Sequence, residues 1–238
     1  MIFEEKIKEH ARENPKEEVC GVLLMDIDNS IRVERMKNES DNKQECFHLS
    51  PQKFLEYKIN NRILGVYHSH PKSTETPSRA DKLMSEELGL PYLVYSLKND
   101  KFFLYYPESY EPHKLISRPY VKCFHECICI WKDYYNKELG INITNWNKNY
   151  WLPEKDNEAN KLLMRILGKN AIKREKEEIK KNDILVFELK KGKRLHVGVA
   201  VGEGEFLHQP INTLSRIDAL DDRWGEKIKH VFRHPSLV

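Results

Sequence analysis

The sequence predicts two domains, an α/β domain followed by an α+β domain. Strands alternate with helices up to residue 106, three prolines interrupt residues 107–119, and helices precede strands in residues 120–238. A chain of 238 residues is long enough for two small cores. We therefore expect domains at 1–106 and 120–238, with 107–119 as the linker.

In the first domain, helices and strands follow from patterning and from residues that begin or end helices. An amphipathic stretch from Ile2 ends before Asn14-Pro15, as helices do. Ser50-Pro51 supplies an N-cap and a first-turn proline, and Ser78 is a second N-cap. The predicted elements are helices at 2–13, 51–61 and 78–89 and strands at 19–25, 31–36, 64–68, 91–97 and 102–106.

In the second domain, helices come first and antiparallel strands follow. A helix with an apolar face begins at Cys127 and ends at Gly140. Turn residues separate the later apolar stretches, which is typical of strands joined by short loops. The predicted elements are helices at 127–139, 157–167 and about 171–180 and strands at 183–189, 194–201, 205–208 and 229–233.

The composition excludes several classes of protein. The net charge is only +3, and the lysines and arginines are mixed with acids, which argues against nucleic-acid and membrane-surface binding. No apolar run approaches the roughly 20 residues needed to span a bilayer. The start at Met1 is typical of an amphipathic helix and not of a signal peptide, so we expect a protein made in the cytosol and not exported by the general secretory route.

Five cysteines, an odd number, argue against a disulfide framework. Three of them, Cys123, Cys127 and Cys129, lie close together, so a structural zinc site is an alternative for this cluster. Their spacing is unlike that of common zinc motifs, and no fourth ligand is apparent.

Two histidines and an aspartate indicate a metal site in the first domain. Side chains alternate along a strand, so His68 and His70 share a face, and Asp81 falls in the first turn of the next helix. Three protein ligands leave a fourth position for water, as a catalytic zinc requires. Glu18 is then the candidate general base, and Ser78 the candidate hydrogen-bond donor to an oxyanion.

Each of these residues also has an ordinary structural interpretation. Ser78 and Asp81 have the spacing of a capping box, His68-x-His70 can be a polar strand end, and Glu18 can be a surface acid. The combination at this spacing favours the metal site.

The same residues resemble a known family. The motif consists of Glu18-x-Cys20-Gly21, His68-x-His70-Pro71, Ser78 and Asp81. It resembles that of the JAMM (MPN-type) metalloproteases, which implies one Zn²⁺ held by the two histidines and the aspartate. The resemblance also implies that Glu18 is the general base and that Ser78 stabilises the oxyanion. Members that cleave isopeptide bonds exist, but this motif does not identify the substrate.

A second set of reactive residues lies in the other domain. Cys127 begins a helix, where the helix dipole favours a thiolate. If Val201 pairs with Glu205 across a three-residue loop, His208 lies diagonal to His196 on the same face of the sheet. This arrangement provides a nucleophile, a base and a group that orients the base. The alternative is a buried thiol and two histidines with structural roles.

The order of Cys127, His196 and His208 resembles that of the NlpC-type cysteine peptidases, which have a papain-like fold. The resemblance implies that these three residues are catalytic, and it places an active-site tyrosine at Tyr120. Glu126 stands where that family usually has aspartate, and small residues do not follow the cysteine.

The order of the two domains resembles that of the tail-tip assembly proteins of long-tailed bacteriophages (the lambda K-like family). This implies a bifunctional peptidase whose second domain cuts peptidoglycan cross-bridge peptides. It also implies other tail-tip proteins as partners, with the protein in the host cytoplasm during assembly and then at the virion tail tip. We expect no nucleic-acid partner and no membrane span. Two alternatives remain: a structural tail-tip adaptor with vestigial sites, and a bacterial isopeptidase that acts on a small modifier protein.

Overall fold

The structure is a computed structural model that describes residues 2–111, 114–143 and 155–238. The chain separates into two compact units. The described residues of the first unit lie between 2 and 110, and those of the second between 111 and 238. Among these described residues, no helix combines the length and the apolar character that crossing a membrane requires.

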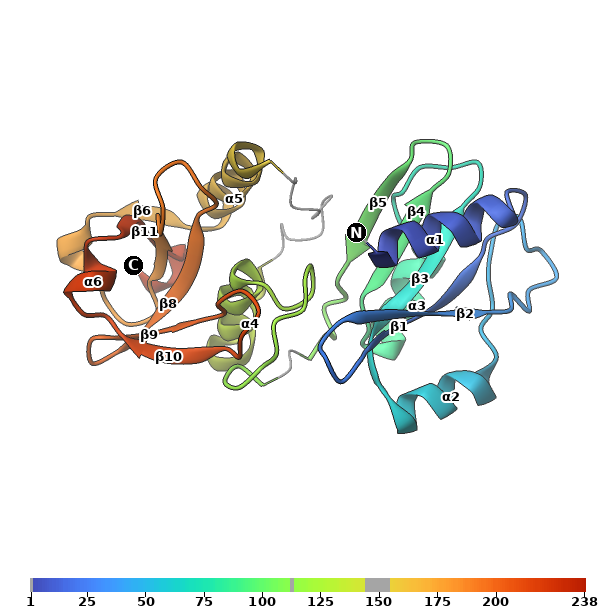
Figure 1. Ribbon diagram of the computed structural model, residues 1–238, viewed down its shortest axis with the longest axis horizontal. Helices are drawn as coiled ribbons and strands as arrows, with labels where there is room; N and C mark the ends of the chain where they lie inside the picture. The colour runs from blue at the N-terminus through green and yellow to red at the C-terminus, as the bar shows by residue number, and fades with distance from the viewer. Residues whose placement is uncertain (1, 112–113, 144–154) are drawn as a thin grey trace. The chain divides into compact units, whose positions relative to one another are not determined.

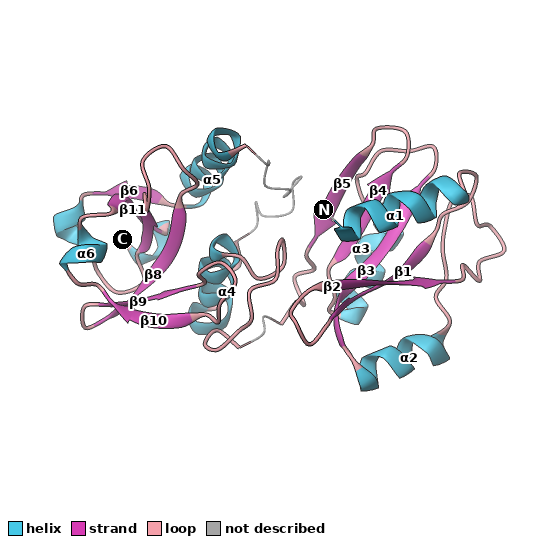
Figure 2. Ribbon diagram, in the orientation of Figure 1, coloured by secondary structure: helices cyan, strands magenta, loops and turns pink. Residues whose placement is uncertain are grey.

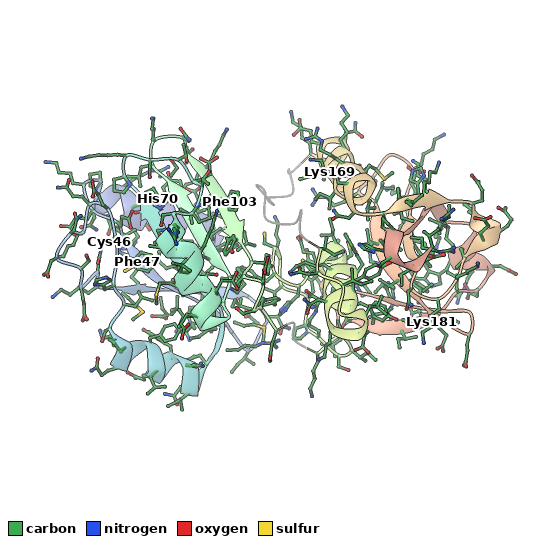
Figure 3. All side chains as sticks on the ribbon, turned by 180° about the vertical axis from the view of Figure 1, so that it is seen from behind. Cys46, Phe47, His70, Phe103, Lys169 and Lys181 are labelled. Carbon is green, nitrogen blue, oxygen red and sulfur yellow. The ribbon has the colours of Figure 1, made fainter. Side chains whose placement is uncertain are left out.

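The first unit is a five-stranded sheet with three helices (Figures 1 and 2). The strand order is β2-β1-β3-β4-β5, with β3 and β4 parallel and the other neighbours antiparallel. Helix α1 lies in front of the sheet in Figure 1, and α3 lies in front of it when the unit is seen from behind in Figure 3. The elements are α1 (Ile2–Glu13), β1 (Cys20–Met25), β2 (Ile31–Met36), α2 (Pro51–Asn60), β3 (Arg62–His70), α3 (Arg79–Leu88), β4 (Tyr92–Ser96) and β5 (Lys101–Tyr105).

The predicted elements of this unit are confirmed, with small shifts at their ends. Ser78 caps α3 as expected, whereas Ser50 stands at the N-cap of α2 without a side-chain capping bond. Gly21 explains one motif position: a Cβ there would lie 2.1 Å from the Glu34 carbonyl oxygen and 2.6 Å from the Tyr67 ring. Only glycine therefore lets β1 approach both of its neighbours.

The second unit is a six-stranded antiparallel sheet with helices α4, α5 and α6. The strand order is β10-β9-β8-β7-β11-β6, and α4 packs on β8 and β9. The elements are α4 (Cys127–Leu139), α5 (Asp156–Asn170), β6 (Ile172–Arg174), η2 (Lys176–Glu178), β7 (Ile184–Phe187), β8 (His196–Gly202), β9 (Glu205–His208), β10 (Arg216–Ala219), α6 (Asp222–Gly225), β11 (Ile228–Arg233) and η3 (Pro235–Leu237).

One predicted helix is wrong. Residues 171–180 form the edge strand β6 and the short 3₁₀ helix η2 instead. Pairing with β11 gives Ile172–Arg174 inter-strand hydrogen bonds that outweigh the high helix propensity of this charged segment. Strand β10 and helix α6 were not expected, because residues 211–225 show little apolar alternation.

The segment predicted as a linker, 107–119, makes hydrogen bonds and an ion pair with other residues near both of its ends. The Glu86 carboxylate accepts hydrogen bonds from the backbone N–H groups of Glu108 and Ser109. At the other end, the Ser117 N–H donates to the Ser215 carbonyl, and Arg118 pairs with the buried Asp133. Residues 112–113 of this segment lie outside the described residues. The domain limits at 106 and 120 stay a prediction.

Candidate functional site

Strand β3 carries both histidines of the first candidate site. His68 lies opposite Cys20 of β1, and both imidazoles point to one side, with their Nε2 atoms 3.1 Å apart. Beyond the paired strand, the Ser69 N–H donates to the Val19 carbonyl and the Val19 N–H donates to Ser69 Oγ. These two bonds hold the chain before β1 against the end of β3, which brings Glu18 next to His70.

Asp81 joins the two histidines from the first turn of α3. Its Oδ1 lies 3.3 Å from His68 Nε2, and its Oδ2 lies 3.6 Å from His70 Nε2. Within the part of the chain that the structure describes, these three side chains form the one group of at least three His, Cys, Asp or Glu that could hold a metal ion. Cys123, Cys127 and Cys129 do not form such a group.

The three ligand atoms fit a zinc ion. A tetrahedral ion with ligands at about 2.0–2.2 Å separates them by roughly 3.3–3.6 Å. The two Nε2 atoms are 3.1 Å apart, and each lies 3.3 or 3.6 Å from one of the two Asp81 oxygens. Two imidazole nitrogens and one carboxylate are also a donor set typical of catalytic zinc.

Neighbouring groups orient the two imidazoles to different degrees. His70 Nδ1 lies 2.6 Å from the Thr74 carbonyl oxygen, which requires a proton on Nδ1 and leaves Nε2 free to bind a metal. His68 stacks on Phe47, and its buried Nδ1 has no hydrogen-bond partner among the described residues. Stacking on Phe47 and the contacts of Nε2 with Asp81 and His70 therefore orient His68.

The charges of these groups are strongly coupled. Burial acts to raise the pKa of Asp81, but His68 and the bonds from His70 and Ser78 hold it well below its usual range. Burial lowers the pKa of His68. For His70 burial acts in the same direction, but Asp81 and the Thr74 carbonyl raise its pKa overall. At neutral pH the Asp81 carboxylate beside the two imidazoles is therefore ionised.

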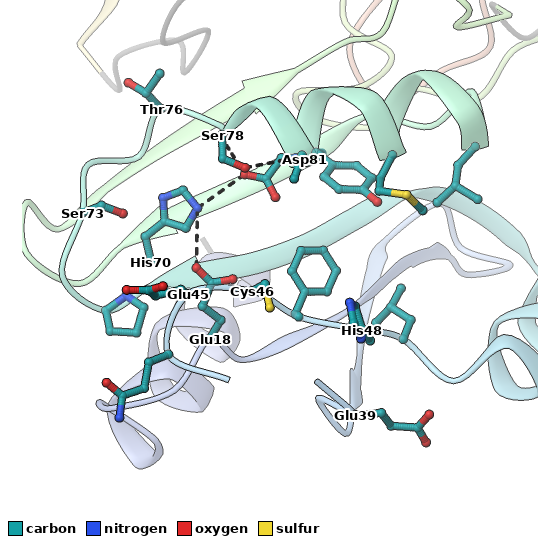
Figure 4. A pocket seen from close by; sticks show the side chains of 18 of the residues that line it. Glu18, Glu39, Glu45, Cys46, His48, His70, Ser73, Thr76, Ser78 and Asp81 are labelled. Carbon is teal, nitrogen blue, oxygen red and sulfur yellow. Dashed lines mark hydrogen bonds and ion pairs between the residues drawn. The ribbon is translucent and has the colours of Figure 1, made fainter. Parts of the chain in front are cut away.

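Glu18 is buried and faces the histidines from outside the ligand group. Its Oε1 lies 3.9 Å from His70 Nε2 (Figure 4). Burial raises the pKa of Glu18 to about 7, and the nearby His70 opposes this shift. The backbone is held on both sides, since the Glu18 N–H donates to the Lys43 carbonyl and the Glu18 carbonyl accepts from Asn38. The carboxyl can exchange a proton near neutral pH.

Ser78 has the capping role that the sequence offered as one of its two interpretations. Its Oγ accepts the Asp81 N–H at 3.1 Å, and the Asp81 carboxylate accepts the Ser78 N–H at 2.7 Å, which completes a capping box. The capping bond occupies a lone pair of Oγ and not its proton. Ser78 also lines the cavity described below.

A cavity of about 1150 Å³ opens beside this site. Glu18, His70, Ser78 and Asp81 line one part of it (Figure 4). Apolar side chains line another part, among them Phe47, Leu49, Phe54, Met84 and Leu88. Figure 3 shows Phe47, Cys46 and His70 in the same region of the unit. The cavity can accept an apolar side chain next to the candidate metal site.

The second candidate site places two histidines on adjacent strands. His208 lies opposite Gly198, two residues from His196 on β8. The expected same-face arrangement is present, and His196 Nε2 lies 2.8 Å from His208 Nδ1. The register shifts only at the turn, where Gly202 and not Val201 pairs with Glu205.

Cys127 is the first residue of α4, which packs on β8. Its sulfur accepts a hydrogen bond from the Val197 backbone, directly after His196. The residue as a whole is partly exposed, whereas Cys123 and Cys129 are buried. Cys127 is therefore the most accessible thiol of this cluster.

The expected stabilisation of a thiolate by the helix dipole is not what the structure favours. Burial raises the pKa of Cys127 to about 12, and Glu126 contributes to this shift. Burial and the nearby His208 and Arg216 lower the pKa of His196 to about 3. At rest the thiol and the imidazole are both neutral, because desolvation outweighs the dipole.

Tyr120 and Asp218 both lie near this site, and only Tyr120 was expected there from the sequence. Tyr120, placed here by resemblance, donates a hydrogen bond to Glu126 at 3.3 Å, and burial raises its pKa. Asp218 was missed: its Oδ2 lies 3.0 Å from His208 Nε2. It belongs to β10, the strand that patterning did not predict, and its alternation with Arg216 was the only available signal.

Comparisons with known proteins agree with this two-part organisation. Residues 3–106 match the family described as prokaryotic homologs of the JAB domain, and residues 122–233 match the NlpC/P60 family. The chain is 24% identical over 236 residues to tail tip assembly protein K of Escherichia phage N15, covering 97% of this chain and 93% of that protein.

Two further proteins are similar to part of the chain. The desampylase of Haloferax volcanii is 30% identical over 103 residues, which are 39% of this chain and 74% of the relative. The solution structure of protein DSY2949 from Desulfitobacterium hafniense is 32% identical, covers 42% of this chain and 77% of that chain, and has a TM-score of 0.35. The chain thus matches the prokaryotic JAB-domain family in its first part and the NlpC/P60 family in its second.

Proposed function

We propose that this chain is a bifunctional peptidase of a phage tail tip. Its first domain would be a zinc-dependent peptidase or isopeptidase, and its second a cysteine endopeptidase that cuts peptidoglycan cross-bridge peptides. The single observation that carries the proposal is the convergence of His68 Nε2, His70 Nε2 and the Asp81 carboxylate, one oxygen of which lies 3.3 Å from His68 Nε2 and the other 3.6 Å from His70 Nε2. A peptidase-family domain with an intact ligand set argues for catalysis and not only for assembly.

In the first domain, His68, His70 and Asp81 would hold one Zn²⁺, which would polarise a water molecule and lower its pKa. Glu18 takes a proton from the attacking water and later passes it to the departing amine. The Ser78 hydroxyl donates a hydrogen bond to the oxygen that becomes negative when the amide carbon turns tetrahedral. The apolar wall of the cavity positions the peptide.

In the second domain, the Cys127 sulfur attacks the amide carbon while His196 takes the thiol proton. His196 then gives this proton to the leaving amine, and the acyl group stays on sulfur as a thioester. Water, deprotonated by His196, hydrolyses the thioester and restores the thiol. His208 orients the His196 ring throughout.

The proposed biological setting follows from the relative that matches along almost the whole chain. Tail tip assembly protein K is named for assembly at a phage tail tip. We infer that other tail-tip proteins are partners of this chain. The protein would act in the host cytoplasm during assembly and then at the virion tail tip, where opening the cell wall requires a peptidoglycan peptidase.

Metal analysis combined with peptidoglycan digestion tests the two activities separately. Purified protein should contain one zinc per chain, and Asp81→Ala should lose it. Mass spectrometry of digested peptidoglycan should reveal cut cross-bridge peptides, which Cys127→Ala abolishes and Asp81→Ala does not. Protein that binds no zinc after supplementation, or peptidoglycan left intact by the wild type, would exclude the corresponding half of the proposal.

One observation favours a second candidate, a structural adaptor whose cysteine site is vestigial. The raised pKa of Cys127, to about 12, and the lowered pKa of His196, to about 3, leave both groups uncharged at rest. An adaptor would assemble into tails normally as Cys127→Ala and would not degrade peptidoglycan in wild-type form. Loss of infectivity in Cys127→Ala particles with complete tails would favour the enzyme.

A further inference from the structure

Asp218 contacts the second candidate site without being part of the expected triad. It pairs with Phe206 across β9 and β10, two residues before His208, so it lies on the same face of the sheet as His208. Its Oδ2 is 3.0 Å from His208 Nε2, and His208 Nδ1 is 2.8 Å from His196 Nε2. The three side chains therefore form a continuous hydrogen-bonded line.

The surroundings of this line hold Asp218 in place and keep water away from His208. Arg216 Nε donates to both oxygens of Asp218, at 2.9 and 3.1 Å. The Trp224 ring packs at 5.2 Å from the His208 ring, and the Phe206 ring at 4.6 Å, between ring centroids. His208 is only 1% exposed, so side chains and not solvent decide which of its nitrogens carries the proton.

The charges of Asp218, His208 and His196 determine how many protons these three side chains share. Burial tends to raise the pKa of Asp218, but Arg216 and His208 hold it below its usual value, so the carboxylate is ionised at neutral pH. Burial lowers the pKa of His208 and of His196, so both imidazoles are neutral. Each ring then carries one proton, on one of two nitrogens.

Hydrogen-bond chemistry allows only one arrangement of these protons. An ionised carboxylate can only accept, so His208 must donate to Asp218 from Nε2. His208 Nδ1 then carries a lone pair and accepts the proton on His196 Nε2. His196 Nδ1 is consequently unprotonated, which is the state that a base for the Cys127 thiol needs.

We propose that Asp218 is a positioning residue that acts through His208 to keep the His196 proton on Nε2 and leave Nδ1 free to accept the thiol proton of Cys127. The role rests on the proposed cysteine peptidase, but the proton positions can be measured without substrate. With the opposite arrangement, His208 would donate to His196, whose Nδ1 would already hold a proton.

The variant Asp218→Asn tests the inference. Arg216 can only donate hydrogen bonds, so it should stay bonded to the oxygen of the new amide group. The NH₂ of that amide then faces His208. His208 would then accept at Nε2 and carry its proton on Nδ1. Two-bond ¹H–¹⁵N NMR spectra distinguish the two tautomers, with signals assigned from His196→Gln and His208→Gln. We expect Nε2–H on both rings in the wild type and Nδ1–H on both in Asp218→Asn.

Two further variants control for folding and for charge. Asp218→Glu keeps a carboxylate acceptor and should retain the wild-type tautomers, whereas Asp222→Asn removes the same charge from an exposed position nearby and should change neither ring. If Asp218→Asn does not fold, Asp218→Ala replaces it, and His208 should then populate both tautomers. Wild-type tautomers in folded Asp218→Asn or Asp218→Ala would overturn the inference.

Kinetics separates this inference from the proposed function. With peptidoglycan as substrate, Asp218→Asn should lower kcat at least about tenfold and leave KM unchanged. We expect a smaller loss than the roughly 10⁴-fold decrease in kcat seen when the orienting aspartate of a serine-protease triad becomes asparagine. If the tautomers change in Asp218→Asn but the wild type does not cleave peptidoglycan, the role of Asp218 is supported and peptidoglycan is rejected as the substrate. If the wild type cleaves peptidoglycan and Asp218→Asn has the same kcat, the role of Asp218 is rejected and the proposed peptidase activity is retained.

Discussion

Glu18 shows how two opposing effects act on a single carboxyl group. Burial raises its pKa to about 7, while the neighbouring His70 favours the ionised form. Its Oε1 lies 3.9 Å from His70 Nε2, near the three ligand atoms without being one of them. This position suits a residue that moves a proton and does not bind the metal.

The variant Glu18→Gln should retain zinc and lose metallopeptidase turnover by about 10²-fold or more, because the amide keeps the shape but cannot accept a proton. Zinc content by atomic absorption and turnover of a cleavable peptide measure the two effects. The control variant is Gln44→Glu, at another residue that lines the cavity, and it should keep both the zinc and the turnover. Loss of zinc in Glu18→Gln would place Glu18 among the metal ligands instead.

Cys127 should react with an alkylating probe faster than Cys123 and Cys129, because residue 127 is partly exposed and the other two are buried. With a thiol pKa of about 12, the thiolate fraction grows as pH rises. The rate should therefore increase about tenfold per pH unit between pH 7 and 9. Peptide mapping by mass spectrometry follows each thiol. A rate that is already constant near pH 7 would indicate a preformed thiolate.

At the scale of elements, the hairpin of β8 and β9 aligns the two histidines, and Gly198 makes this alignment possible. A Cβ at Gly198 would lie 2.8 Å from the Phe206 ring, 3.0 Å from the Leu207 carbonyl oxygen and 3.4 Å from the His208 Cβ. Close approach of the strands therefore depends on the absence of a side chain directly opposite His208.

The substitution Gly198→Ala should lower the free energy of unfolding by about 1–3 kcal/mol, the usual cost of overpacking a core. Because His208 must move, peptidoglycan cleavage should fall as well. Denaturant unfolding measures the first effect and a digestion assay the second. Gly168→Ala in α5, where a Cβ meets nothing within 4 Å, is the matched control and should not destabilise the protein. Equal stability of the two variants would contradict the tight approach.

For the whole molecule, the limits of the connecting segment follow from the bonds at its two ends. Glu86 holds residues 108 and 109, and the bonds of Ser117 and Arg118 hold the other end. Limited proteolysis should therefore cut first within residues 111–116. Mass spectrometry of the early fragments locates the cut. First cuts within residues 107–110 or 117–119 would mean that these bonds do not protect the backbone.

Each candidate site lies within one unit, so a chelator should affect only the first unit. Removing zinc should lower the unfolding temperature of that unit, because a ligand present at 100 times its dissociation constant stabilises the folded state by about 2.7 kcal/mol. Calorimetry with and without chelator measures this. His70→Ala, which lacks a ligand, should show no further change, and a shift of the second unit's transition would contradict independent sites.

The spacing of residues along the chain was sufficient to predict the ligand group of the first site. Strand alternation puts His68 and His70 on one face, and the capped start of α3 puts Asp81 within reach, so short-range rules predicted the ligand group. The same rules predicted the relation of His196 to His208. The sequence therefore determined the two-part organisation, most elements and the candidate ligands, because each depends on neighbours close in the chain.

Only the tertiary structure decided the remaining features. Asp218 reaches His208 through β10, a polar strand whose formation depends on pairing with β9 and not on its own apolar pattern. The high pKa of Cys127 arises from burial between α4 and β8, which outweighs the dipole that the sequence suggested. Burial and cross-strand contacts depend on residues distant in the chain, and no local pattern contains that information.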